Sequence, residues 1–202
     1  MRKLVLAVGL LSASALPLQG ASLSKTYSYF TIGGTTVEEI ENELARHGPK
    51  IKSTGARHPG ATRMEFTSRV SYGEAGNGRC SVVQVNVSVK ANVILPRWNR
   101  RRSADGDTRL IWDTLSADIK RHEESHVVIA RNHAREMEAA LKEIRGERDC
   151  AIAQQKAKVV TERILAKHDA EQERFDRIEG INFERRLLRQ LRHRITRTQA
   201  TR

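Results

Sequence analysis

Residues 108–144, TRLIWDTLSADIKRHEESHVVIARNHAREMEAALKEI, form the longest stretch of the chain with a single hydrophobic period. Its apolar side chains recur at intervals of three and four residues, which places them on one face of an α-helix. His122, His126 and His133 fall on the same face. The stretch contains neither Gly nor Pro, and Gly146 follows it. The pattern therefore predicts one long amphipathic helix that carries three histidines on its packed face.

A second amphipathic pattern runs from Cys150 to Ile178, a few residues beyond the first. Long helices joined by a short connection pack antiparallel, so the two segments are predicted to form a helical hairpin. Beyond Gly180 the sequence is rich in arginine and compatible with a helix but has no clear period. We expect residues 181–202 to form a basic tail that is either helical or disordered.

The strands are predicted upstream of the hairpin. Residues 83–93 alternate Val or Ala with polar side chains, which is the period of a half-buried strand, and Pro96 is expected to end it. A similar alternation covers residues 64–72, and the glycine-rich segment between the two favours a β-hairpin. The aromatic and β-branched residues of 26–32 predict a further strand.

Thr36 and Glu39 have the spacing of a capping box, in which each side chain accepts a hydrogen bond from the other residue's backbone. They predict a short helix that ends at Gly48-Pro49. The predicted fold class is therefore α+β. A small antiparallel sheet with an amino-terminal helix is expected to pack on the long antiparallel helical hairpin.

The segment His122-Glu123-Glu124-Ser125-His126 has the order H-E-x-x-H. A spacing of four places both imidazoles on one helical face, about 6 Å apart, so that they can share one Zn²⁺ ion. Glu123 is rotated away from that line and can take a proton from a water molecule beside the metal. The motif predicts His122 and His126 as metal ligands and Glu123 as the catalytic base. The alternative is a pair of core histidines whose hydrogen bonds are satisfied within the protein.

The third ligand is predicted to come from the second helix. His133 lies about 10 Å along an unbroken helix from His126 and therefore does not reach the same ion. A hairpin that turns near residue 148 places Glu171 and Asp176 at about the height of the motif. We expect Glu171 or Asp176 to be the third ligand. The alternative for Glu171 is a salt bridge to an arginine of the first helix.

The amino terminus has the features of a secretory signal peptide. Two basic residues precede an uncharged run from Leu4 to Leu18, so we assign residues 1–20 to the signal and expect a periplasmic or secreted protein. The remaining residues 21–180 are long enough for one domain. In an oxidising compartment the two cysteines, Cys80 and Cys150, are expected to form a disulfide bond.

The net charge of +12 is concentrated at residues 97–102 and in the tail. Behind a signal peptide this charge favours an anionic envelope surface as a partner, and no nucleic acid is expected. A solvated basic face with no partner is the alternative.

Three features resemble a known family. They are the step Leu95-Pro96-Arg97-Trp98, the segment from His122 to Ala130, and the widely spaced cysteine pair. This combination resembles a bacterial family of unknown function whose members are described as predicted secreted zinc-dependent proteases. The resemblance covers about residues 25–180. It implies a zincin-like metallopeptidase domain over residues 21–180, with His122 and His126 as ligands of one Zn²⁺ ion and Glu123 as the base.

The chain departs from this family after the second helix. The family tends to carry the pattern Tyr-Asp-x-x-Thr-x-His-Gly, where residues 175–182 of this chain read FDRIEGIN. Asp176 matches the pattern, whereas Glu179, Ile181 and Asn182 replace the Thr, His and Gly.

Taken together, the sequence predicts a zinc-dependent hydrolase that cleaves peptide bonds of protein or peptide substrates in the cell envelope. The alternative is a non-catalytic envelope protein of the same fold that binds an anionic partner through its basic loop and tail. The departures at Ile181 and Asn182 favour the alternative, and the intact Glu123 favours the enzyme.

Overall fold

A computed structural model describes residues 20–51, 55–76 and 78–200. The predicted signal peptide therefore lies outside the described residues except for Gly20. The elements follow the order β1 (Ser22–Ile32), α1 (Val37–His47), β2 (Ala61–Glu74), β3 (Cys80–Trp98), a short 3₁₀ turn (Arg101–Ser103), α2 (Gly106–Lys142) and α3 (Cys150–Ala200). This is a mixed α+β fold, as predicted, with one three-stranded sheet and three α-helices.

The sheet has the strand order β1-β3-β2 and is mixed, not antiparallel throughout. The predicted hairpin is present, because β2 pairs antiparallel with β3. The strand β1, however, pairs parallel with β3, from Ser22 opposite Ser88 to Ile32 opposite Trp98. The chain leaves β1 through α1, returns along β2 and reverses again at the hairpin, so β3 runs in the direction of β1. The valine-rich strand is thus central, and the two sheet edges belong to β1 and β2.

Pro96 does not end β3, contrary to the prediction. The pairing with β2 begins at Ala61 opposite Ile94, so β3 continues beyond that point with only β1 as its neighbour. A proline is tolerated where one side of a strand is unpaired, because its missing N–H removes no ladder hydrogen bond there.

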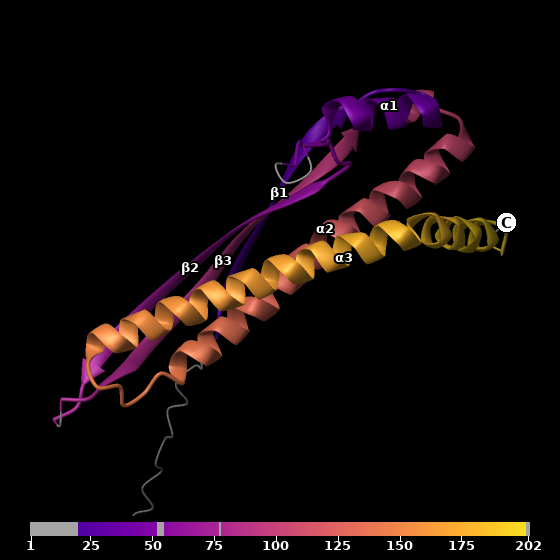
Figure 1. The fold of residues 1–202 in the computed structure, drawn as a ribbon. Helices are drawn as coiled ribbons and strands as arrows, with labels where there is room; N and C mark the ends of the chain where they lie inside the picture. Colours follow the sequence, from indigo (N-terminus) through magenta and orange to yellow (C-terminus); the bar gives the residue numbers. More distant parts are fainter. Residues whose placement is uncertain (1–19, 52–54, 77, 201–202) are drawn as a thin grey trace, which may run out of the picture.

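The two long helices cover one face of the sheet (Figure 1). The side chains of Val85, Val87, Val89 and Val93 point into this layer and are buried, whereas the alternate residues Gln84, Asn86 and Lys90 are exposed. The main core joins Val85, Val87 and Val89 to aliphatic side chains of α2 and α3, and Val93 packs in a neighbouring cluster with Ile119 and Val127 of α2. A smaller cluster packs Ile40 and Leu44 of α1 against Ile32, Trp98 and Trp112. The capping box at Thr36 and Glu39 is formed.

The second arm of the hairpin is longer than the sequence period indicates, because α3 continues through Gly180 to Ala200 (Figure 1). A single glycine costs about 1 kcal/mol in a helix, which neighbouring contacts can offset. Arg186 provides such contacts by binding Asp118 of α2 through two nitrogens, at 2.9 and 3.0 Å. In the described part of the chain no helix combines the length and apolar character required to cross a bilayer.

The predicted disulfide is confirmed and joins the start of β3 to the start of α3. Cys80 and Cys150 are separated by 70 residues, and Cys80 also exchanges two backbone hydrogen bonds with Glu147. In the chain-entropy description, closing a loop of this size stabilises the fold by about 4 kcal/mol. The bond fixes the turn end of the hairpin against the sheet.

Candidate metal centre

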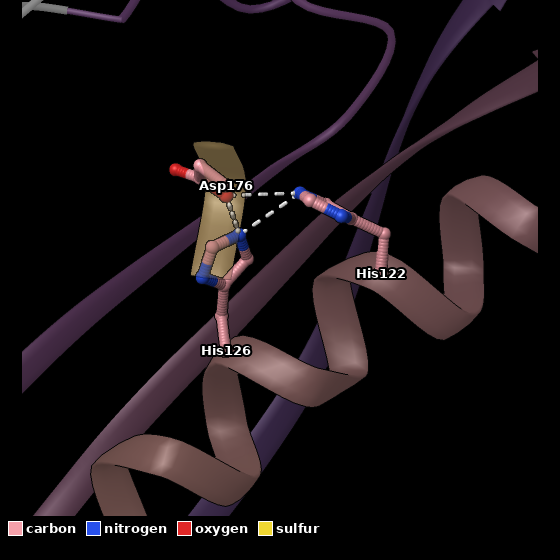
Figure 2. Close-up of side chains that lie close together, drawn as sticks. All are labelled: His122, His126 and Asp176. Carbon is pink, nitrogen blue, oxygen red and sulfur yellow. Dashed lines mark hydrogen bonds and ion pairs between the residues drawn. The ribbon is translucent and has the colours of Figure 1, made fainter. Parts of the chain in front are cut away.

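His122 and His126 project from one turn of α2 towards α3, where Asp176 meets them (Figure 2). The two Nε2 atoms are 3.1 Å apart. Oδ1 of Asp176 lies 3.2 Å from Nε2 of His122 and 3.1 Å from Nε2 of His126. Three potential ligand atoms from two helices therefore converge on one point.

The separations of these atoms fit a small tetrahedral cation. Ligands at about 2.0–2.1 Å from a tetrahedral zinc ion lie about 3.3 Å from one another, close to the three observed distances. Two imidazole nitrogens and a carboxylate oxygen are also donor types that zinc accepts. All three can act as acceptors, so their convergence requires positive charge between them, either as protons or as a metal ion. The residues present therefore fit a zinc ion.

The carboxylate and the imidazoles influence each other's pKa. Burial by itself would raise the pKa of Asp176, but hydrogen bonds to His122 and His126 hold it well below its usual range. Burial would likewise lower the pKa of His126, yet the hydrogen bonds to Asp176 and Gln172 outweigh it and raise the pKa. The arrangement thus favours a carboxylate and a positive charge in the same place.

Phe175 fixes the orientation of both rings. Its ring stacks on His122 with centroids 5.0 Å apart, and it meets the edge of His126 at 5.2 Å. The side chain of His126 is only 12% exposed, whereas that of Asp176 is 55% exposed. The site is therefore packed on the Phe175 side and open to solvent beside the carboxylate.

Glu123 points to a different side of α2, towards the beginning of β2. Its carboxylate accepts a hydrogen bond of 2.9 Å from the hydroxyl of Thr62, which also donates to the Glu123 carbonyl at 3.0 Å. Burial raises the pKa of Glu123, while Thr62 and the nearby His126 and His122 oppose that rise. A buried carboxyl with a raised pKa beside two imidazoles is suited to exchanging protons.

Gly60 lets the loop before β2 approach Glu123. A Cβ atom at this position would lie 2.8 Å from Oε1 of Glu123 and 2.9 Å from Cγ2 of Ile119, closer than side chains tolerate. Neither Gly60 nor Thr62 could be assigned to the site from the sequence, because both lie about sixty positions from Glu123 and belong to no periodic pattern.

A cleft of about 260 Å³ borders the metal centre. The loop residues His58, Pro59 and Gly60 form one wall. The opposite walls come from α2, with Ile119, His122 and Glu123, and from α3, with Asp176 and Phe183. Two of the candidate ligands, His122 and Asp176, and the candidate base therefore line the same cleft.

A cluster of paired charged residues lies between α2 and α3, next to the candidate ligands. Oε2 of Glu179 lies 3.7 Å from Nδ1 of His122 and forms ion pairs with Arg121 and Arg186. Asp118, which is 3% exposed, binds Arg186 and Arg121. Burial would raise the pKa of Asp118, but the two guanidinium groups lower it on balance. Glu179 thus faces Nδ1 of His122, while Nε2 of the same ring faces Asp176.

Of the two predicted third ligands, Asp176 reaches the histidine pair and Glu171 does not. Oε2 of Glu171 lies 2.9 Å from Nε2 of His133, so its partner is a histidine of α2 and not an arginine. α2 ends at Lys142 and α3 begins at Cys150. His122 faces residue 176, two positions beyond the residue 174 expected for a turn at residue 148.

The fold and the site together define an α+β protein with a candidate cation site held between two helices. The chain belongs to the family described as bacterial protein of unknown function (DUF922), whose model matches residues 27–184. The matched region includes His122, Glu123, His126 and Asp176. No curated protein and no solved structure matches the chain.

Proposed function

We propose that the protein is a zinc-dependent peptide-bond hydrolase of the bacterial cell envelope. The convergence of His122, His126 and Asp176 at mutual distances of 3.1 to 3.2 Å is the observation that carries this proposal. The adjacent cleft and the buried Glu123 on its wall supply space and a proton acceptor.

One zinc ion would be held by Nε2 of His122, Nε2 of His126 and a carboxylate oxygen of Asp176. When bound there, zinc supplies a Lewis acid for the scissile carbonyl and lowers the pKa of a water molecule to about 7. The exposed side of Asp176 leaves room for water and substrate on the open side of the site.

Glu123 acts as the general base in this proposal. Its carboxylate takes a proton from the attacking water and returns that proton to the leaving amine, so the residue ends each cycle as it began. Thr62 holds the carboxylate in place through its hydroxyl. The raised pKa of Glu123 suits this exchange, because a proton acceptor works best when its pKa approaches the working pH.

The substrate is proposed to be an extended segment of a protein or peptide. In the described sheet β1 and β2 are the outer strands, and each presents an edge to which a further strand could be added. Of these, β2 begins at Ala61, beside the cleft, and its Thr62 contacts the base. We therefore propose that the outer edge of β2 aligns the substrate. We also propose a periplasmic or secreted location, which the Cys80–Cys150 disulfide supports.

The role of Glu123 is tested with zinc-loaded protein and an unfolded protein as substrate. The Glu123→Gln variant is expected to retain zinc and to lose hydrolysis by a factor of about 10³ or more. Glu124→Gln is the matched control, because Glu124 points to Lys25 and Tyr27 on the other side of α2. The control is expected to cleave at the unsubstituted rate. Undiminished cleavage by Glu123→Gln, or activity that resists a chelator, would reject the proposal.

A second candidate function is binding of an anionic surface through the end of α3. Arg185, Arg189 and Arg192 are exposed and follow the spacing i, i+4, i+7, so they line one face of the helix. This end of α3 projects away from the sheet (Figure 1). Co-sedimentation with vesicles containing anionic lipid is expected to exceed that with neutral vesicles and to fall with salt. Equal binding to both vesicle types would exclude this function.

A further inference from the structure

We infer that Gln172 and His168 are positioning residues that hold His126 in the tautomer whose Nε2 lone pair faces the cation site. The inference rests on the proposed zinc site and extends it into α3. It follows from the hydrogen bonds that connect these three residues.

The orientation of the Gln172 side chain is determined by a backbone group. Nε2 of Gln172 lies 3.1 Å from the carbonyl oxygen of His126, and a carbonyl can only accept. The amide nitrogen must therefore face that carbonyl, which leaves Oε1 on the side of the His126 ring. Oε1 lies 2.6 Å from Nδ1 of His126 and accepts a hydrogen bond from it.

This contact determines the tautomer of His126. A neutral imidazole carries one proton, and the proton is on Nδ1 when that nitrogen donates to the amide oxygen. Nε2 is then the ring nitrogen that faces Nε2 of His122 and Oδ1 of Asp176, so its lone pair is the one that a cation between these atoms would take. Metal-binding histidines are commonly oriented in this way by a group that accepts from the other ring nitrogen.

His168 holds the amide from the opposite side. Nε2 of His168 lies 2.9 Å from Nε2 of Gln172, and the amide nitrogen can only donate. Nε2 of His168 therefore accepts, which places the proton of a neutral His168 on Nδ1. Nδ1 lies 2.9 Å from Oδ1 of Asp169 and donates to it.

The four residues form one directed chain of hydrogen bonds. His126 donates to Gln172, Gln172 donates to His168, and His168 donates to the exposed carboxylate of Asp169. His168 is 6% exposed, and its ring is held against the edge of Phe66 at 4.9 Å. Rotation of any member would place two donors or two acceptors against each other, so the chain permits one arrangement.

The test compares two substitutions of His168 in the full-length protein. The amide oxygen of His168→Gln can reach the former position of Nε2 and accept from Gln172. The shorter His168→Asn side chain reaches only about as far as Nδ1 and leaves the Gln172 amide without this acceptor. Both variants remove the imidazole, so they share the loss of the contact with Phe66.

The tautomer of His126 is measured in metal-free protein, at a pH at which the ring is neutral, by two-bond ¹H–¹⁵N correlation spectra. Zinc affinity is measured separately by competition with a chromophoric chelator. We expect the Nδ1–H tautomer in the unsubstituted protein and in His168→Gln, with zinc affinities within about twofold of each other. His168→Asn is expected to show mixed tautomers and an affinity about tenfold weaker, the lower end of the range for supporting residues.

The inference is overturned if His168→Asn keeps both the tautomer and the affinity, or if His168→Gln loses as much as His168→Asn. A role in packing alone would lower the melting temperature of both variants without altering the tautomer. Failure of the proposed function is recognised separately, because an unsubstituted protein that binds no zinc would reject the zinc site while its tautomer is still measured without metal.

Discussion

The two ends of the interface between α2 and α3 are built from opposite kinds of side chains. At the end near the disulfide the hydrophobic core includes Ala134, Met137, Leu141, Ala153, Ala157 and Ile164. The buried carboxylate of Glu138 in this region is paired with Lys142. At the other end the facing residues are His122, His126, Asp118, Asp176, Glu179 and Arg186. The same pair of helices therefore has an aliphatic half and a charged half.

The two halves of the interface are expected to contribute differently to the stability of the fold and to the function of the site. Burial of aliphatic side chains stabilises a fold directly, whereas buried charges remove water from polar groups and stabilise little unless each charge is paired. In the charged half each buried group has a partner, and the partners surround the cleft. We infer that the aliphatic half holds the hairpin together and that the charged half is retained for the chemistry of the site.

The largest effect on stability is expected in the aliphatic half. Leu141 is fully buried, so Leu141→Ala should lower the free energy of unfolding by about 3 kcal/mol through lost burial and a cavity. Urea denaturation measures this change. Val159→Ala on the same hairpin is the control, because Val159 is 51% exposed and its loss should cost less than about 0.5 kcal/mol. An equal effect of both substitutions would contradict the division into two halves.

A smaller loss of stability is expected from removing the buried charge of Asp118. Asp118→Asn weakens the pairing of Arg186 and Arg121 and should lower the free energy of unfolding by about 2 kcal/mol at neutral pH. Asp113→Asn is the matched control, because Asp113 forms an exposed pair with Arg101 and should contribute less than about 1 kcal/mol.

The pH dependence of the Asp118 contribution has a definite sign. The pKa of Asp118 is lowered in the folded protein, so its contribution is complete above the pKa of the unfolded chain, about 4. It is lost as the pH falls through the lower pKa of the folded state. The difference in unfolding free energy between the unsubstituted protein and Asp118→Asn should therefore shrink from pH 7 to pH 3. A difference that stays constant over this range would show that the charge of Asp118 is not responsible.

The smallest effect on stability, with a large effect on hydrolysis, is expected at Gly60. The added methyl group of Gly60→Ala would meet Oε1 of Glu123 and Cγ2 of Ile119, so the loop or the carboxylate must shift by a few tenths of an ångström. We expect a stability loss of about 1 kcal/mol, unchanged zinc content and slower cleavage of an unfolded substrate. Gly76→Ala is the control, since a Cβ there meets nothing within 4 Å. Full activity of Gly60→Ala would show that the position of Glu123 is not critical.

The aliphatic half of the α2–α3 interface is predictable from the sequence, and the charged half is not. The aliphatic half follows a regular apolar period, so α2 and the start of α3 could be predicted. The pairing of Cys80 with Cys150 was predictable on different grounds, because they are the two cysteines of a chain expected in an oxidising compartment. The charged half has the composition of a solvated surface, and nothing in the sequence of Arg186 or Glu179 indicates that they pack against α2. For this reason the sequence period indicates the second helix only as far as Ile178 and leaves residues 181–202 as either helical or disordered, whereas α3 continues to Ala200.

The choice between Glu171 and Asp176 also could not be made from the sequence. Both carboxylates lie at a suitable height on α3. A shift of two residues in the register of α3 against α2 decides which one meets His122 and His126. The parallel pairing of β1 was missed for a related reason, because hydrophobic alternation indicates a strand but not its direction.

The central claim is that one turn of α2 and one carboxylate of α3 hold a single zinc ion. The most direct test is the zinc content of the full-length protein after equilibration with zinc and removal of unbound metal, compared with that of His126→Ala and of the exposed-histidine control His47→Ala. The account predicts one zinc ion per chain in the unsubstituted protein and the control, and less than about a tenth of that in His126→Ala. Equal zinc content in all three proteins, or none in any of them, would contradict it.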